Sequence, residues 1–341
     1  MPDRATSFAG VLADQPAFRR KQCLEAMFAS GFSAWKDVVV LPKALRERLA
    51  IEVSWMTVKE KRVLGGRNGD VSKALLELED GSCIESVLMR NSREQWSVCV
   101  STQVGCAMKC SFCATGKLGL KRNLTVDEIV DQYRFWKSHL AAKNDPDRIS
   151  NIVLMGMGEP LANYENVKAV LQTWLKYTDV GPTHITVSTV GVLPRLEQIL
   201  HDETWPEVRL AISLHSAMTE KRKVLMPSTA NDFLPHLADW TKRYLEKFGN
   251  RRHHLTFEYI LINDVNDTKS DLEALALFVQ NAGRVKVNLI PYNTTGTFKT
   301  SGKDHIEAFA RKLEEHGVTV TVRRSMGDEI DAACGQLANK E

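Results

Sequence analysis

Three cysteines within eight residues constrain this chain more than any other feature. Cys106, Cys110 and Cys113 stand in the run CAMKCSFC, with the spacing C-x3-C-x2-C. A closed iron–sulfur cluster takes four Cys ligands and a structural zinc ion takes four ligands, but residues 114–123 contain no further Cys or His. Three thiolates that hold a four-iron cluster leave one iron open. Zinc binding, or three buried free thiols, is the alternative.

The spacing of the three cysteines resembles that of radical S-adenosylmethionine (SAM) enzymes, in which SAM chelates the fourth iron. This resemblance implies two cofactors. One is a [4Fe-4S] cluster with Cys106, Cys110 and Cys113 as its ligands, and the other is SAM bound to the open iron.

The other four cysteines, Cys23, Cys83, Cys99 and Cys334, lack the paired spacing of a secreted disulfide framework. The N-terminus shows no basic and then apolar signal segment, and no apolar run approaches the length that spans a bilayer. We therefore expect a cytoplasmic protein without a membrane partner. A reducing compartment also suits an oxygen-sensitive cluster.

The chain has 341 residues, enough for one large domain and a small one, and a formal net charge of +3. So small a charge does not by itself indicate a nucleic-acid partner. Short Lys and Arg clusters are more often solvated surface than phosphate contacts, but one follows the cysteines, where a polyanionic substrate would approach. That cluster is Lys117, Lys121 and Arg122, and the others lie at 19–21, 221–223, 251–252 and 323–324.

The first ninety residues predict a small unit of helices and a hairpin. Apolar residues at helical spacing predict two helices, and Pro42 suits the first turn of the second. Alternating residues on both sides of Asp80 and Gly81 predict a β-hairpin. The helices are expected over residues 15–30 and 42–56, and the hairpin strands over 73–78 and 83–89.

After Trp96 the pattern changes to strands that alternate with helices. One helix, over residues 126–140, opens with a capping box of Thr125 and Glu128. Six strand–helix units predict an α/β fold whose parallel sheet forms a partial (βα)6 barrel, open on one side. The strands are expected over residues 97–101, 151–155, 184–189, 208–214, 255–261 and 285–290, with a further strand over 318–323.

Candidate ligand-binding residues follow these strands, at the edge where the catalytic groups of such sheets collect. In the run MGMGEPL, glycines let the backbone approach a ligand, and the Glu carboxylate can accept from the ammonium group of SAM. Taken singly, a Gly-Glu pair is more often a turn, and a Ser or His at a strand end is usually structural. The expected SAM-binding residues are Gly158, Glu159, Ser188, Ser213, Leu214, His215 and Asn293.

Along its whole length the chain resembles the RlmN/Cfr family of radical-SAM RNA methyltransferases. The closing CGQL and the Cys in the first core strand, Cys99, distinguish this family from other radical SAM enzymes. The resemblance implies methylation of an adenine carbon in 23S ribosomal RNA and, for the RlmN type, also in transfer RNA. The runs that carry it are GCAMKCSFCATGKLGLKRNLT, MGMGEPLANY, LAISLHS, VNLIPYN and GDEIDAACGQL.

The resemblance also assigns roles in the reaction. An adenine carbon is a poor nucleophile, so a radical route is needed. Cys334 takes a methyl group from one SAM and becomes S-methylcysteine, and a radical from a second SAM activates that methyl for addition to the ring. Glu85, in CIESV, is the implied proton acceptor. Cys99 is the implied resolving thiol, which leaves a transient disulfide with Cys334.

From their residue types alone, two of these assignments have simpler interpretations. Glu85 fits the outward side of an alternating strand, and Cys99 fits a small core position. Cys23 and Cys83 have no assigned role. The chain is therefore expected to divide into an N-terminal accessory and RNA-binding domain (1–91), a radical SAM core (92–326) and a C-terminal segment with the methyl-accepting Cys (327–341).

The resemblance implies several partners. They are 23S ribosomal RNA and transfer RNA, an electron donor such as flavodoxin or ferredoxin, and a thiol reductant, with the enzyme as a monomer. The N-terminal helices are expected to hold RNA by phosphate contacts, and the target adenine is expected to leave its stack.

The methylated carbon is predicted to be C2, because housekeeping enzymes of the RlmN type are commoner than the resistance type. Pro160 after Glu159 also matches the RlmN type. The alternative is methylation at C8 by a Cfr-type enzyme that confers ribosomal antibiotic resistance, since residues 40–49 and 112–129 look at least as close to that type. A non-enzymatic iron–sulfur or zinc protein that binds RNA is the second alternative.

Overall fold

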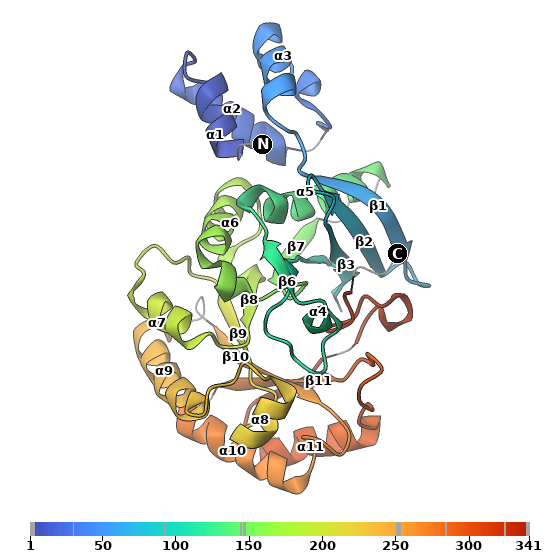
Figure 1. The fold of residues 1–341 in the computed structure, drawn as a ribbon, viewed down its shortest axis with the longest axis vertical. Helices are drawn as coiled ribbons and strands as arrows, with labels where there is room; N and C mark the ends of the chain where they lie inside the picture. Colours follow the sequence, from blue (N-terminus) through green and yellow to red (C-terminus); the bar gives the residue numbers. More distant parts are fainter. Residues whose placement is uncertain are drawn as a thin grey trace.

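The parallel strands predicted after Trp96 form one side of a ten-stranded sheet (Figure 1). The structure is a computed structural model that describes residues 4–29, 31–91, 93–143, 145, 148–249, 254–283, 285–323 and 325–338. The sheet order is β1 (Val58–Gly65), β2 (Val71–Leu78), β3 (Cys83–Arg90), β4 (Trp96–Cys99), β7 (Ile149–Leu154), β8 (Ile185–Thr189), β9 (Arg209–Ser213), β10 (Leu255–Leu261), β11 (Lys286–Pro291) and β12 (Val320–Val322).

All neighbours from β4 to β12 pair in parallel, which confirms the predicted α/β class and radical SAM type of sheet. Helices follow these strands and cover the outside of the sheet (Figure 1). They are α5 (Val126–Ala142), α6 (Tyr164–Tyr177), α7 (Leu193–His201), α9 (Phe233–Phe248), α10 (Lys269–Ala282) and α11 (Lys303–Glu315). The short helix α8 (Thr219–Leu225) instead packs against the cysteine loop, where the Ser111 N–H donates to the Leu225 carbonyl oxygen.

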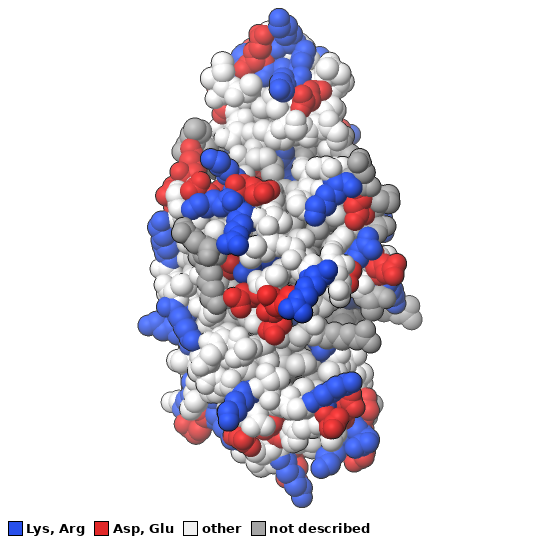
Figure 2. Space-filling view, turned by 90° about the vertical axis from the view of Figure 1, so that its right-hand side faces the viewer, with Lys and Arg blue, Asp and Glu red and all other residues white. Residues whose placement is uncertain are grey.

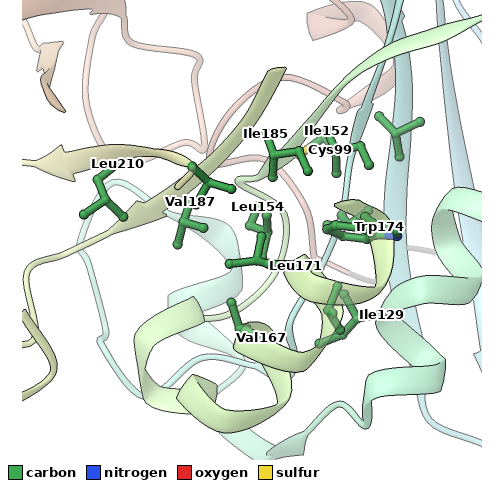
Figure 3. Close-up of a cluster of buried hydrophobic side chains, with 14 of the residues drawn as sticks. Cys99, Ile129, Ile152, Leu154, Val167, Leu171, Trp174, Ile185, Val187 and Leu210 are labelled. Atoms are coloured by element: carbon green, nitrogen blue, oxygen red, sulfur yellow. The ribbon is translucent and has the colours of Figure 1, made fainter. Parts of the chain in front are cut away.

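The core lies between the sheet and these helices. Ile152 and Leu154 of β7 and Val187 of β8 point toward α6, where Leu171 and Trp174 meet them (Figure 3). All five side chains are at most 1% exposed. Burial of large apolar side chains at about 1.5–3 kcal/mol each makes this layer the main support of the sheet.

The capping box predicted for α5 is present. Glu128 N–H donates to Thr125 Oγ1 over 3.2 Å, and Thr125 N–H donates to Glu128 Oε2 over 2.9 Å. The two predicted N-terminal helices are also present, as α2 (Ala17–Phe28) and α3 (Lys43–Glu52), and the predicted hairpin is β2 and β3.

Some short elements were not predicted from the sequence. They include α1 (Arg4–Val11), α4 (Ala114–Lys117), strand β1 and the hairpin of β5 (Gln103–Gly105) and β6 (Leu120–Asn123). The sequence of β1 does not indicate a strand, because residues 59–62 are all charged and exposed. That composition is common in a strand at the edge of a sheet and removes the alternation by which strands are predicted.

The proposed boundary at residue 91 falls within the large sheet. Strands β3 and β4 flank that boundary and pair antiparallel, with Val87 opposite Cys99. The N-terminal hairpin therefore extends the parallel sheet, while α1, α2 and α3 lie beyond it at one end of the molecule (Figure 1). The division into three parts stays a prediction. Within the described residues, no helix is long and apolar enough to cross a bilayer.

A buried carboxylate joins the N-terminal helices to the core. Asp131 of α5 accepts from Arg4 of α1 over 2.6 Å, from the Thr57 N–H over 2.7 Å, and from Arg134. The three charged side chains are at most 5% exposed. Burial opposes ionisation of Asp131, but Arg134 and Arg4 prevail and lower its pKa to about 2.

We predict that Asp131→Asn lowers the free energy of unfolding by about 3–5 kcal/mol at neutral pH, because it leaves two buried guanidinium groups undercompensated. The folded-state pKa lies below the ordinary value of 3.8, so the part of this stabilisation that ionisation supplies, about 2–3 kcal/mol, is present above pH 3.8 and is lost as pH falls through about 2. Denaturant unfolding across this range should show the difference between the two proteins shrinking by about that amount in acid. Asp14→Asn, which breaks an exposed pair with Arg48, is the control and should change little.

Candidate active site

The carboxyl ends of the parallel strands surround a cavity, the kind of position at which ligands bind in such sheets. The three cysteines of the CAMKCSFC loop line one side of it. The lining also includes the strand-end residues Gly158, Glu159, Ser188, Ser213 and His215, and Cys334 from the C-terminal segment. The structure thus brings together the cysteines and five of the seven residues expected to bind SAM.

The conformation of the cysteine loop depends on glycines at positions where a side chain would clash with the backbone. Gly105 has φ +78°, and a Cβ there would lie 1.8 Å from the Gly119 carbonyl oxygen. Cys106 N–H donates to that same oxygen over 2.9 Å. Gly116 of α4 packs against the backbone of Cys110. The hairpin of β5 and β6 therefore closes the base of the loop, and α4 supports its far end.

The three cysteine side chains are close enough to affect one another's ionisation. Burial raises the pKa of Cys106 to about 11, and the neighbouring Cys113 adds to the rise. Burial raises the pKa of Cys110 further, again with Cys113 and Cys106 contributing. Bound iron cations would favour the thiolates that these surroundings disfavour. Three thiols that face one cavity thus fit the ligand set of a cluster with one open iron.

The described residues contain no group of three or more His, Cys, Asp or Glu side chains arranged to hold a metal ion. The three cysteines instead line one cavity. A four-iron cluster does not need its ligands to converge on a single ion, because each of its thiolates binds a different iron.

Glu159 is a buried carboxylate that ties its own loop to the end of β8. It accepts from the Leu161 N–H over 2.9 Å, from Thr189 Oγ1 over 2.6 Å and from the Val190 N–H over 2.8 Å. Burial nevertheless raises its pKa above the ordinary value. A carboxylate offers about four acceptor positions, so one is left for a ligand ammonium group at the cavity wall.

Two of the expected SAM-binding residues lie outside the main cavity. Leu214 is fully buried in the core. Asn293 lines an adjoining cavity, where its Nδ2 donates to the carbonyl oxygen of Cys334 over 3.2 Å. His215 lines the main cavity, but its Nδ1 accepts from the Ile260 N–H over 3.0 Å, and burial with Arg222 lowers its pKa to about 3. His215 is therefore neutral at physiological pH.

The adjoining cavity is lined by two further cysteines. Cys99 and Cys334 both line it, and Cys334 lines the main cavity as well. Burial raises the pKa of Cys99 to about 12, and the nearby Cys334 contributes to the rise. Both are free thiols. Cys99 is 6% exposed and packs among hydrophobic core side chains (Figure 3). It is therefore a core residue that shares a cavity with a second thiol.

Glu85, the expected proton acceptor, lines neither cavity. It is fully buried on β3, where its Oε1 lies 3.0 Å from Lys73 Nζ of β2. Its Oε2 accepts from the Ala338 N–H over 2.7 Å. The outward position suggested by its strand pattern is wrong, because the C-terminal segment covers this part of the hairpin.

Three charged residues near the cavity were not identified from the sequence as site residues. Arg323 and Glu258 line the cavity, and Arg323 Nη1 lies 3.5 Å from Glu258 Oε2. An acidic residue within the apolar run LTFEYIL was the available signal for Glu258. Arg222 is 1% exposed and donates to the carbonyl oxygens of Leu214 and Val190. Its expected surface position is therefore wrong.

The basic cluster that follows the cysteines is mostly paired within the protein. Arg122 contacts Asp80 over 2.9 Å and Glu128 over 2.8 Å, and Lys121 Nζ lies 3.8 Å from Asp80. Lys117 Nζ donates to Thr297 over 3.0 Å. Arg251, Arg252 and Arg324 of the other clusters lie outside the described residues.

We predict that Gly158→Ala weakens SAM binding by about ten- to hundredfold, because Gly158 has φ +104° and an added Cβ would lie 2.6 Å from the Cβ of Gln103. The shift would also disturb the Glu159 N–H bond to Gln103 Oε1. Equilibrium dialysis of cluster-loaded protein with labelled SAM measures the loss. Gly69→Ala is the matched control, since Gly69 has φ +75° and open space around it. Equal binding by both variants would contradict the assignment of this loop.

Comparison with known proteins identifies the family. The model of the radical SAM superfamily matches residues 100–279. A protein of Symbiobacterium thermophilum named probable dual-specificity RNA methyltransferase RlmN is 41% identical, over 97% of this chain and 89% of its own length. A Geobacillus kaustophilus protein of the same name is 40% identical, over 97% and 89%. The crystal structure of a radical SAM methyltransferase from Sphaerobacter thermophilus is 35% identical, with a TM-score of 0.89 and 96% of both chains covered.

These matches confirm the expected cofactors, because radical SAM proteins use a [4Fe-4S] cluster and SAM, and the three cysteines of the cavity fit such a cluster. They favour an enzyme over the non-enzymatic metal protein that was the second alternative. The chain belongs to the radical SAM superfamily and, within it, to the family of RlmN-type RNA methyltransferases.

Proposed function

We propose that this enzyme methylates C2 of an adenine in 23S ribosomal RNA and of an adenine in transfer RNA. The reaction passes through an S-methylcysteine intermediate at Cys334, and each turnover consumes two SAM molecules. The observation that carries the proposal is the position of Cys334, which lines both the cavity of the three cysteines and the cavity of Cys99. The curated relatives, named dual-specificity RNA methyltransferases, support the RNA substrates.

In the proposed reaction, the cluster with bound SAM supplies a one-electron cleavage of the sulfonium that generates an organic radical. The protein's own residues bind and orient the reactants. Cys106, Cys110 and Cys113 would hold three irons, and Glu159 would accept from the SAM ammonium group at its remaining acceptor position. Ser188 and Ser213 line the same cavity and can donate to SAM oxygens. Asn293 lines the adjoining cavity and donates to the backbone carbonyl oxygen of Cys334.

Cys334 carries the methyl group, and Arg323 is a cation near it. Burial acts against the charge of Arg323, but Cys334, Glu258 and Cys99 raise its pKa above the ordinary value. This cation offsets a small part of the rise that burial causes in the pKa of Cys99. After the methylene joins the adenine, the adduct gives one electron back to the oxidised cluster and its ring proton to Glu85. The Cys99 thiolate then attacks the Cys334 sulfur and the carbon–sulfur bond breaks. Its electron pair stays on the carbon, which takes up a proton to become the methyl group, and a disulfide remains for a thiol reductant.

Glu85 is proposed to accept the proton that the ring carbon loses. Its side chain is buried, and its Oε1 lies 3.0 Å from Lys73 Nζ. Glu85 accepts from the N–H of Ala338, four residues after Cys334. This hydrogen bond ties Glu85 to the segment that carries the reacting thiol. Reaching a bound adenine requires a rearrangement of that contact.

RNA is proposed to bind across the N-terminal helices and the cavity mouth. Figure 2 shows Lys and Arg interspersed with Asp and Glu over one face of the described structure. Mixed charge of this kind favours a few defined phosphate contacts over strong non-specific binding. We further propose a monomer that works in the cytoplasm, with flavodoxin or ferredoxin as the electron donor. A reducing compartment suits both the cluster and the thiol cycle.

We predict that a strain lacking its own adenine C2 methyltransferase gains 2-methyladenosine in 23S ribosomal RNA and transfer RNA when this chain is expressed. Chromatography and mass spectrometry of digested RNA separate 2-methyl- from 8-methyladenosine. An 8-methyl product would replace the proposal with the Cfr-type reaction. The Cys334→Ala chain is the control and should leave both nucleosides at background.

We predict that Cys99→Ala still methylates Cys334 but stalls as a covalent adduct of enzyme and RNA, because no thiol attacks the Cys334 sulfur. Denaturing gels of anaerobic reactions with SAM, reductant and RNA should show a shifted band that nuclease removes. Cys23→Ala, which changes a buried cysteine of α2, is the matched control and should turn over normally. Normal turnover by Cys99→Ala would remove Cys99 from the mechanism.

A further inference from the structure

The C-terminal segment, residues 325–338, is docked between the N-terminal hairpin and the cysteine loop (Figure 1). Ala114 N–H donates to the Gly335 carbonyl oxygen over 2.7 Å, and Thr115 Oγ1 donates to that of Leu337 over 2.6 Å. These contacts come from α4, directly after the third cysteine. They fix one side of the loop that holds Cys334.

A buried ion pair fixes the opposite side of this loop. Lys73 Nζ donates to the Asp331 carbonyl oxygen over 3.1 Å, three residues before Cys334. Glu85 Oε2 accepts from the Ala338 N–H over 2.7 Å, four residues after Cys334. The two side chains lie 3.0 Å apart and are 5% and 1% exposed. One charged pair on neighbouring strands thus makes hydrogen bonds to both ends of the loop that carries Cys334.

We propose that the Lys73–Glu85 ion pair is a latch that holds the Cys334 loop in place, with Lys73 as a positioning residue for Cys334. The proposal deepens the proposed function and rests on it for the role of Cys334. A buried charged pair is costly unless further polar groups complete its hydrogen bonds, and here the C-terminal segment provides two of them. Docking of the segment and stability of the pair therefore support each other.

The latch also links the position of the segment to the availability of Glu85. While Ala338 N–H occupies Oε2 and Lys73 lies beside Oε1, the carboxylate faces the segment and lines neither cavity. Release of residues 331–338 frees one carboxylate oxygen and the thiol loop together. The enzyme would thus keep its base engaged until the Cys334 loop moves.

The test uses the full-length, cluster-loaded chain under anaerobic conditions, without SAM or RNA. In Lys73→Met, amide hydrogen exchange of residues 331–338 should become about ten- to hundredfold faster, the factor expected for losing a hydrogen bond to a charged group. Alkylation of Cys334 by iodoacetamide should accelerate similarly, while that of the buried Cys23 should not change. Lys61→Met, on β1 and in a partly exposed pair with Glu77, is the matched control.

The double variant Lys73→Met with Glu85→Gln removes both charges and so leaves no unpaired buried carboxylate. Faster exchange confined to residues 331–338 in this variant supports the latch. Unchanged exchange and alkylation in both variants would overturn it. Uniformly faster exchange across the sheet would also overturn it, because the pair would then be a general support of the hairpin. Failure of Cys334 to accept a methyl group from SAM would refute the proposed function while leaving these measurements unaffected.

Discussion

Parallel pairing of the strands from β4 to β12 is the constraint on which the site depends. It turns the carboxyl ends of all these strands toward one edge, so loops far apart in the chain meet around one cavity. Main-chain bonds within the strands leave the loop ends without ladder partners, and these loops need other support. Arg222 and Glu159 provide part of this support. Arg222 donates to the carbonyl oxygens of Leu214 and Val190, and Glu159 accepts from the N–H groups of Leu161 and Val190.

The two cavities divide the chemistry between different parts of the chain. The three-cysteine loop lies at one side, and the Cys99 and Cys334 thiols lie at the other. Arg323 lines both cavities and contacts Glu258, so one cation is shared by the two regions. The C-terminal segment contacts α4 on one side and the hairpin on the other. Its position therefore decides how the methyl-carrying thiol faces the cysteine loop.

Much of the fold could be predicted because the core strands and helices follow simple patterns. Buried runs such as 208–214 have the length and residue types of parallel strands, and Thr125 with Glu128 marks the start of a helix. The site residues came from strand ends and from family resemblance. Patterns could not reveal Arg222, because burial of a charge depends on distant carbonyl groups. They also misplaced Glu85, since the segment that covers it lies some 250 residues later in the chain.

The charged composition of β1 has a consequence for folding. An outer strand exposes unpaired backbone groups that can recruit a strand from another molecule. Residues 59–62 carry four successive charges on this strand, and all four are exposed. Joining two copies here would strip these charged side chains of water. The strand is thereby protected against intermolecular β-sheet growth, which would otherwise compete with closure of the slowly assembled parallel sheet.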